Sequence, residues 1–109
     1  MSSAPISTAL LSYGMSGMVF HAPLLQSVSG FHISKIVQRK EPTAAKAIPG
    51  VAVVKTVDEV WDDPSIELVI VNTPNDTHFE YTLKALEAGK HVVVEKPFTI
   101  TTQEADALI

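Results

Sequence analysis

Residues 6–17 read ISTALLSYGMSG, an apolar run that passes into a turn with two glycines. The run from Ile6 to Ser12 has the length and content of a short buried strand. The segment that follows, 18–28, is rich in Leu, Val and Phe and can be helical, with a kink or a restart expected at Pro23. The stretch therefore predicts a strand, a tight turn and a helix in that order.

The turn has part of the spacing of a dinucleotide-binding loop, which has glycine at its first, third and sixth positions. Ser12, Gly14 and Gly17 occupy these positions, so the first glycine is replaced by a small residue. Gly14 would let a pyrophosphate approach the backbone, Gly17 would let the helix pack on the strand, and the amides of Met15 and Ser16 would face a phosphate. Two glycines can also make a turn that binds nothing, and the strand before and the helix after favour the phosphate loop.

The rest of the chain alternates strand and helix patterns. Three Thr-x-x-Glu sequences, at Thr56, Thr77 and Thr101, match the capping box that begins helices. Further strands are expected at 31–38, 51–54, 66–71 and 91–94, with helices at 44–48, 56–63, 77–88 and from 101 onward. This alternation predicts an α/β fold: an open doubly wound parallel sheet of the Rossmann type, strand order 3-2-1-4-5, with helices on both faces.

Composition and charge narrow the class of protein. With 109 residues, 46% apolar and 18% charged, the chain suits one globular domain and not a disordered segment. A net charge of −4 argues against nucleic-acid binding, and the absence of cysteine excludes a disulfide scaffold and a thiolate zinc site. His32 and His91 share no ligand spacing, so no metal is expected. No apolar run reaches the roughly 18 residues of a membrane span and the N-terminus does not resemble a signal peptide, so we expect a cytoplasmic protein.

Ligands of such sheets bind beyond the carboxyl ends of the strands, where the strand order reverses. The second strand ends in Gln38-Arg39-Lys40, with no acid until Glu41. An Asp or Glu there would bind the ribose hydroxyls of NAD, whereas an Arg accommodates the 2′-phosphate of NADP. Arg39 therefore favours NADP over NAD, although Arg39 and Lys40 can also be ordinary solvated charges.

Two more loops reach the same edge. Asn75 and His78 lie at the start of a helix after the fourth strand, where such residues are also common as caps, and for His78 alone a packing role is favoured. Glu95 and Lys96 follow the fifth strand; Lys96 could anchor a substrate hydroxyl or move its proton, or could simply form an ion pair. His21, on the first helix near this crevice, is expected to be structural.

These motifs resemble the N-terminal domain of the glucose–fructose oxidoreductase / inositol dehydrogenase / rhizopine catabolism (Gfo/Idh/MocA) family. The resemblance rests on residues 12–17 with 20–23 (FHAP), 73–78 (TPNDTH) and 88–98 (AGKHVVVEKPF), and the FHAP sequence is most similar to the NADP-dependent scyllo-inositol dehydrogenase-like branch. It implies hydride transfer between a nicotinamide and a sugar, inositol or related polyol. It also implies that Lys96 is catalytic, near the nicotinamide and the substrate. The expected cofactor-binding residues are Tyr13, Gly14, Met15, Ser16, Gly17, Arg39, Thr73, Asn75, His78, Glu95, Lys96 and Pro97.

The family has a second domain that supplies further catalytic residues and usually the oligomer interface. We expect residues 1–109 to be the dinucleotide-binding domain alone, ending inside a helix, inactive by itself and derived from a homo-oligomeric parent. The alternative is a non-catalytic nucleotide-binding module such as a redox sensor, against which Lys96 argues because a sensor needs no lysine at the hydride site. A vestigial interaction domain is a third alternative, supported weakly by Ser12.

Overall fold

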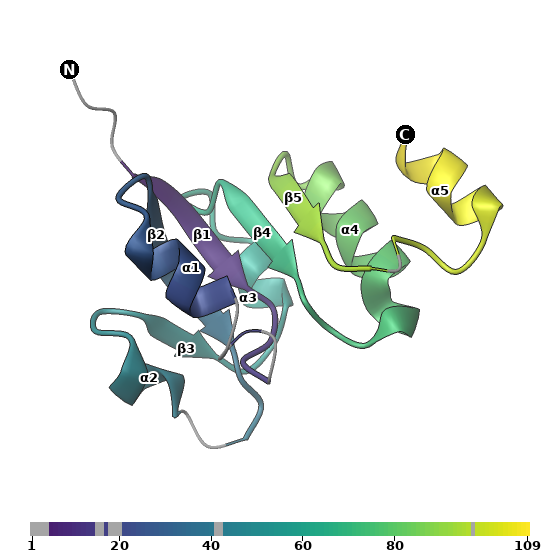
Figure 1. Ribbon diagram of the computed structural model, residues 1–109. Coiled ribbons are helices and arrows are strands. Elements are labelled where there is room, and N and C mark those ends of the chain that lie inside the picture. The colour runs from purple at the N-terminus through teal and green to yellow at the C-terminus, as the bar shows by residue number, and fades with distance from the viewer. Residues whose placement is uncertain (1–4, 15–16, 18–20, 41–42, 97) are drawn as a thin grey trace.

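The fold is a five-stranded parallel sheet with strand order β3-β2-β1-β4-β5, as the sequence predicts (Figure 1). The computed structural model describes residues 5–14, 17, 21–40, 43–96 and 98–109. Each strand pairs in parallel with its neighbour, and β1 lies in the middle, between β2 and β4. The strands are β1 (Ile6–Leu10), β2 (Phe31–Val37), β3 (Ala52–Val54), β4 (Leu68–Val71) and β5 (His91–Val94).

Helices cover both faces of the sheet, because side chains of the central strands alternate between two apolar clusters. On one face Leu10 and Ile70 pack with residues of α1 and α2, and on the other Leu11 and Val71 pack with residues of α3 and α4. The expectation of two covered faces is confirmed. The helices are α1 (Ala22–Ser27), α2 (Ala44–Ala47), α3 (Asp58–Trp61), α4 (His78–Glu87) and α5 (Thr102–Leu108), with a 3₁₀ turn, η2 (Asn75–Thr77), before α4. No helix in the described ranges is long and apolar enough to cross a bilayer.

Two strands are shorter than their apolar runs. β1 stops at Leu10 instead of Ser12, although the amide of Leu11 still donates to the carbonyl of Ile70 (3.2 Å). β4 begins at Leu68 instead of Ile66, because the amide of Ile66 closes a turn onto Asp63 (3.2 Å). Buried residues therefore extend beyond the paired strand at the end of β1 and at the start of β4. An apolar run in the sequence overstates the length of a strand.

The buried side of α4 differs from the expected one. The apolar spacing predicts that Phe79, Leu83 and Leu86 face the core, but the buried residues are His78, Thr82 and Ala85. The helix is thus turned so that short side chains at 82 and 85 meet the sheet, which lets the two elements approach closely. Phe79 and Leu83 are half-buried and Leu86 is exposed.

One of the three predicted capping boxes forms its N-cap hydrogen bond, although its acid accepts from the Ile100 amide (3.1 Å) and not from that of Thr101. Thr101 accepts a hydrogen bond from the amide of Glu104 (3.1 Å) at the start of α5. Thr77 instead donates to the carbonyl of Pro74 (2.6 Å), which builds η2 and leaves α4 without a side-chain cap. Thr56 donates its hydroxyl to the Glu59 carboxylate (3.3 Å), so of this box only the hydrogen bond that the Thr56 amide donates to Glu59 remains (3.3 Å).

Two lysines bind the loop between α3 and β4. Lys90 is buried, and its Nζ donates to the carbonyls of Asp63 (2.7 Å) and Ile66 (2.9 Å). Lys35 forms an ion pair with the Asp63 carboxylate (2.8 Å), which also accepts bonds from the Ser65 amide and hydroxyl. The hydrogen bond from Lys35 and then those from Ser65 hold the pKa of Asp63 far below its usual range, against the opposing effect of burial.

Candidate functional site

A pocket of about 370 Å³ lies beyond the carboxyl ends of β1, β2 and β4. This is the point where the strand order reverses, since β1 has β2 on one side and β4 on the other. The lining comes from three loops and one helix and consists of Leu11, Ser12, Tyr13, Gly14, Val37, Gln38, Arg39, Lys40, Thr73, Pro74, Thr77 and Tyr81. The described lining contains two cations and no carboxylate.

The first loop is held in shape by Ser12, the residue that replaces the first glycine of the fingerprint. Its hydroxyl accepts a hydrogen bond from the Gly14 amide (3.2 Å), and its carbonyl accepts one from Nδ2 of Asn72 (2.9 Å). A hydroxyl thus closes the turn that the missing glycine would otherwise permit. The replacement is compatible with a tight loop.

The two glycines of this loop have different surroundings. A Cβ at Gly17 would lie 2.6 Å from the Ser12 carbonyl oxygen and 2.9 Å from Nδ2 of Asn72, closer than any side chain allows. Among the described residues, a Cβ at Gly14 would meet only the Ser12 hydroxyl, at an ordinary 3.6 Å. Gly17 is therefore needed for packing against β4, whereas Gly14 leaves open space on the pocket side of the loop.

The loop after β2 has a fixed backbone and exposed cationic side chains. Gln38 donates to the hydroxyl of Thr43 (2.8 Å) and accepts from the amide of Ala44 (3.0 Å), so one side chain ties the strand end to the start of α2. Lys55 donates to the carbonyl of Lys40 (2.8 Å). Among the described side chains, Arg39 forms no ion pair and donates one hydrogen bond, to the hydroxyl of Tyr81 (3.4 Å). This arrangement presents positive charge to the pocket.

The loop after β4 contributes Thr73 to the pocket, and His78 holds the backbone of this loop in place. His78 is buried, and because a carbonyl can only accept, its Nε2 donates to the carbonyl of Thr73 (2.9 Å). His78 does not line the described pocket, and Asn75 is exposed in η2. The histidine thus acts on the pocket through the loop that it holds.

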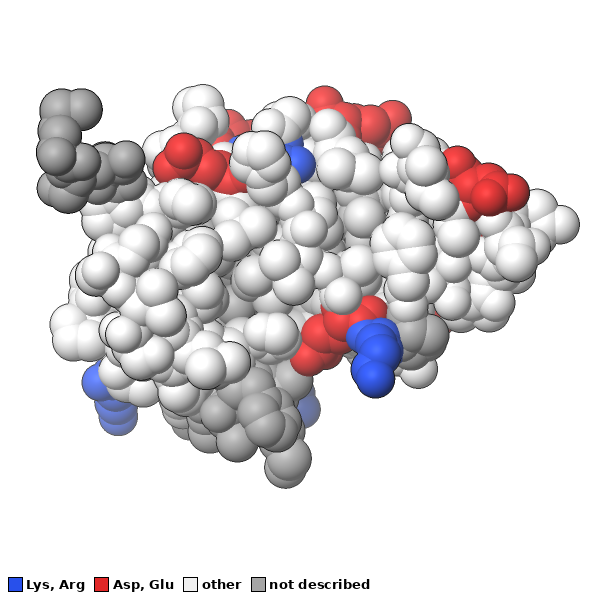
Figure 2. All heavy atoms as spheres, turned by 45° about the horizontal axis from the view of Figure 1, so that its top comes forward, with Lys and Arg blue, Asp and Glu red and all other residues white. Residues whose placement is uncertain are grey.

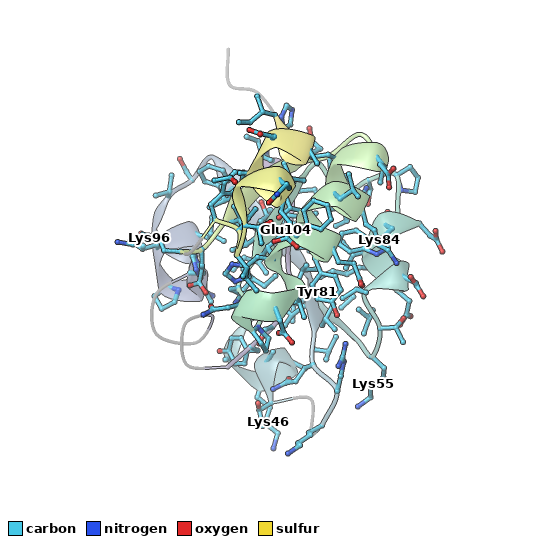
Figure 3. The ribbon with its side chains drawn as sticks, turned by 90° about the vertical axis from the view of Figure 1, so that its right-hand side faces the viewer. Lys46, Lys55, Tyr81, Lys84, Lys96 and Glu104 are labelled. Carbon is cyan, nitrogen blue, oxygen red and sulfur yellow. The ribbon has the colours of Figure 1, made fainter. Side chains whose placement is uncertain are left out.

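Glu95 and Lys96 lie on the same edge of the sheet, beside this pocket and not in its lining. Glu95 pairs with Nε2 of His21 at the start of α1 (2.8 Å), which joins the FHAP and EKP sequences. Lys96 is exposed and projects away from the fold (Figure 3), and no described carboxylate forms an ion pair with it. The edge therefore has a paired acid next to a lysine with an unpaired charge.

The residues assigned from sequence fall into two groups. The structure gathers Tyr13, Gly14, Arg39 and Thr73 around the pocket, with Gly17 packed beneath. It places Asn75, His78, Glu95 and Lys96 outside the pocket lining, and Met15, Ser16 and Pro97 lie outside the described residues. Eight further residues line the pocket without being assigned to cofactor binding from the sequence: Leu11, Ser12, Val37, Gln38, Lys40, Pro74, Thr77 and Tyr81.

The sequence gives only a partial signal that Tyr81 belongs to the pocket. It lies three residues after His78, close to it around the helix, but its distance from Arg39 along the sequence concealed their contact. In the described part of the chain, no three His, Asp or Glu side chains come close enough together to hold a metal ion.

Known proteins match both the sequence and the fold. The profile of an oxidoreductase family with an NAD-binding Rossmann fold matches residues 6–109. The scyllo-inositol 2-dehydrogenase (NADP+) of Bacillus subtilis is 45% identical over 94% of this chain and 29% of its own length. A solved structure from Bacteroides fragilis is 46% identical, with a TM-score of 0.94, over 97% of this chain and 33% of that one. GenD2 from gentamicin A biosynthesis, solved with NAD, is 30% identical, with a TM-score of 0.89, over 99% of this chain and 31% of that one.

The chain thus spans about a third of the length of the relatives that it matches. The family profile, the strand order and the loop sequences agree over nearly all of it. The chain belongs to the Gfo/Idh/MocA family of oxidoreductases, in which it corresponds to the NAD-binding Rossmann domain.

Proposed function

We propose that this domain binds NADPH in preference to NADH, as part of an oxidoreductase that acts on a sugar, an inositol or a related polyol. The observation that carries the cofactor preference is the chemistry of the pocket: Arg39 and Lys40 line it and no described carboxylate does. An acid in this place would repel a 2′-phosphate and bind ribose hydroxyls, whereas a guanidinium can form two parallel hydrogen bonds to a phosphate.

The shape of the site fits a dinucleotide. Gly14 has no side chain to keep a pyrophosphate away from the first loop, and Tyr13, Thr73 and Arg39 line the same pocket. Arg39 and Lys40 would hold the phosphorylated ribose, and the first loop the pyrophosphate. Gln38 and Lys55 keep the backbone around the cations in place without a ligand, so less order has to be gained on binding.

Lys96 is the proposed catalytic residue, at the edge where the nicotinamide would supply hydride chemistry. Its ammonium is exposed, and no described carboxylate pairs with it, so it is available to a substrate hydroxyl. The B. subtilis relative named above acts on scyllo-inositol with NADP+. By extension we propose a polyol or sugar substrate, with the remaining groups supplied by a further domain of a homo-oligomeric parent.

Calorimetric titration of the chain with NADPH and with NADH tests the proposed cofactor preference. We expect tighter binding of NADPH. Arg39→Ala should weaken NADPH binding about tenfold or more, as expected for loss of a charge-assisted hydrogen bond, and should leave NADH nearly unchanged.

Lys84→Ala is the matched control, because Lys84 is an exposed lysine on α4 that does not line the pocket. It removes the same charge, and alanine suits a helix. An equal loss of NADPH affinity in both variants would mean that net charge and not Arg39 sets the preference. Equal affinity of the unmodified chain for the two cofactors would refute the proposed preference.

A further inference from the structure

Tyr81 connects the hydrophobic core to the candidate cofactor pocket. Among the described residues of α4, Tyr81 alone lines the pocket. Its ring lies 6.2 Å from that of Trp61 in α3, tilted by 54°, and packs against the cluster between the sheet and these helices. Figure 3 shows Tyr81 on α4, whereas Lys96 points outward from another side of the molecule. The ring is therefore fixed by the core while the hydroxyl reaches the pocket.

The hydroxyl meets Arg39. Nη2 of Arg39 donates to the Tyr81 oxygen at 3.4 Å, across 42 positions of sequence. No described carboxylate forms an ion pair with Arg39, so this contact is what orients its guanidinium in the described structure. An exposed arginine otherwise samples many rotamers, and restricting them beforehand lowers the entropy lost when a ligand binds.

We propose that Tyr81 is a positioning residue that raises the preference for NADPH over NADH by holding Arg39 over the pocket. The proposal rests on the proposed function of this pocket and adds a residue to it. Arg39 supplies the positive charge, and Tyr81 orients the guanidinium. A carboxylate in the place of Tyr81 would also neutralise that charge. A phenol suits this role because its oxygen can accept a hydrogen bond from a guanidinium.

A double-mutant cycle separates this role from core packing. Tyr81→Phe removes the hydroxyl and keeps the ring that packs on Trp61. We expect it to weaken NADPH binding about threefold to tenfold, in line with one hydrogen bond, and to leave NADH binding unchanged. In an Arg39→Ala background the same change should have no further effect, because the residue that Tyr81 positions is then absent.

The ratio of the two affinities is the decisive measurement, because a purely structural tyrosine would change both. Equal weakening of NADPH and NADH by Tyr81→Phe would overturn the proposal and assign Tyr81 to the general shape of the pocket. Additive effects of the two substitutions would also overturn it, because Tyr81 would then act independently of Arg39. In either case the unmodified chain would still prefer NADPH, so the proposed function would stand, whereas loss of that preference would refute both.

Discussion

Gly14 and Gly17 lie three positions apart in one loop, yet the packing requires glycine only at position 17. A methyl group at position 17 would overlap the Ser12 carbonyl and Asn72, while one at position 14 would fit. We expect Gly17→Ala to destabilise the domain by about 1–3 kcal/mol, the usual cost of forcing atoms into a packed site. Gly14→Ala should change stability by less than about 0.5 kcal/mol. Urea unfolding followed by circular dichroism measures both.

The same pair of variants separates folding from binding. If a phosphate approaches the loop at Gly14, the added methyl group in Gly14→Ala should weaken NADPH binding in a fully folded protein. A Gly14→Ala variant that binds NADPH as tightly as the original chain would place the phosphate elsewhere. A Gly17→Ala variant of unchanged stability would contradict the close contact between the loop and β4.

Asp63 makes a pH-dependent contribution to stability. Its pKa is lowered in the folded state, first by the hydrogen bond from Lys35 and then by those from Ser65, so the folded protein favours the ionised form. The resulting stabilisation is complete above the ordinary pKa of about 3.9 and is lost as the pH falls through the lower folded value. We expect Asp63→Asn to cost about 1–2 kcal/mol at pH 7 and progressively less below pH 4.

Denaturant unfolding at pH 7, 4 and 3 measures this effect, with Asp62→Asn as the control. Asp62 is the exposed neighbour and forms no ion pair with a described residue. A difference between the original chain and Asp63→Asn that stays constant from pH 7 to pH 3 would show that the carboxylate charge does not matter.

At the scale of elements, the His21–Glu95 pair joins the start of α1 to the loop after β5. The two side chains meet at 2.8 Å and are 20% and 29% exposed, so solvent only partly screens them. We expect His21→Ala and Glu95→Ala each to destabilise the domain by about 1 kcal/mol. Their double variant should lose little more than either single variant, because both remove one shared contact. Thermal unfolding of the four proteins measures the coupling, and strictly additive losses would exclude it.

The order of elements was predictable because it depends on local patterns. Apolar runs and turn residues predict β1 to β5 and their parallel pairing, and the structure agrees. The buried side of α4 was not predictable, since the close fit of Thr82 and Ala85 against the sheet is a tertiary effect that hydrophobic spacing does not encode. Thr77 likewise looks like a cap in sequence, but Pro74 offers it a nearer partner in the 3₁₀ turn.

Residues of the candidate site were predictable where they belong to a sequence motif. They were unpredictable where only a tertiary contact brings them to the pocket. Gly14, Arg39 and Thr73 belong to recognisable loops and line the pocket. Tyr81 meets Arg39, 42 positions earlier, only because the fold brings these segments together, and the bond from Gln38 to Thr43 spans five positions but belongs to no motif. Such contacts have no spacing rule, so sequence patterns alone could not have found them.

At the scale of the whole molecule, apolar side chains remain exposed around β5, the last strand of the sheet. Val93, Phe98 and Ile100 are 47%, 42% and 64% exposed. On the face in Figure 2, Lys and Arg side chains are isolated from one another and Asp and Glu side chains form small separate groups, with uncharged surface between them. We expect reversible self-association of the chain through this edge, seen by light scattering as a mass that rises with concentration.

Val93→Lys should reduce that association, since a charge on an edge strand disfavours pairing. Leu24→Lys serves as the control, because Leu24 is also apolar and is even more exposed (64% against 47%) but lies on α1. A mass that is independent of concentration would refute the expectation. An equal effect of both variants would assign the association to non-specific contacts between exposed apolar side chains.

The central place of β1 has a consequence for synthesis on the ribosome. β1 emerges first, pairs with β2 soon afterwards, and must wait for β4, whose Leu68 lies opposite Thr8. At about 5–20 residues per second, one edge of the middle strand stays open for several seconds after the first half of the sheet can form. During that interval the nascent chain exposes the edge of an apolar strand. We therefore expect misassembly, and the need for a chaperone, to be greatest before residue 71, the end of β4, leaves the exit tunnel.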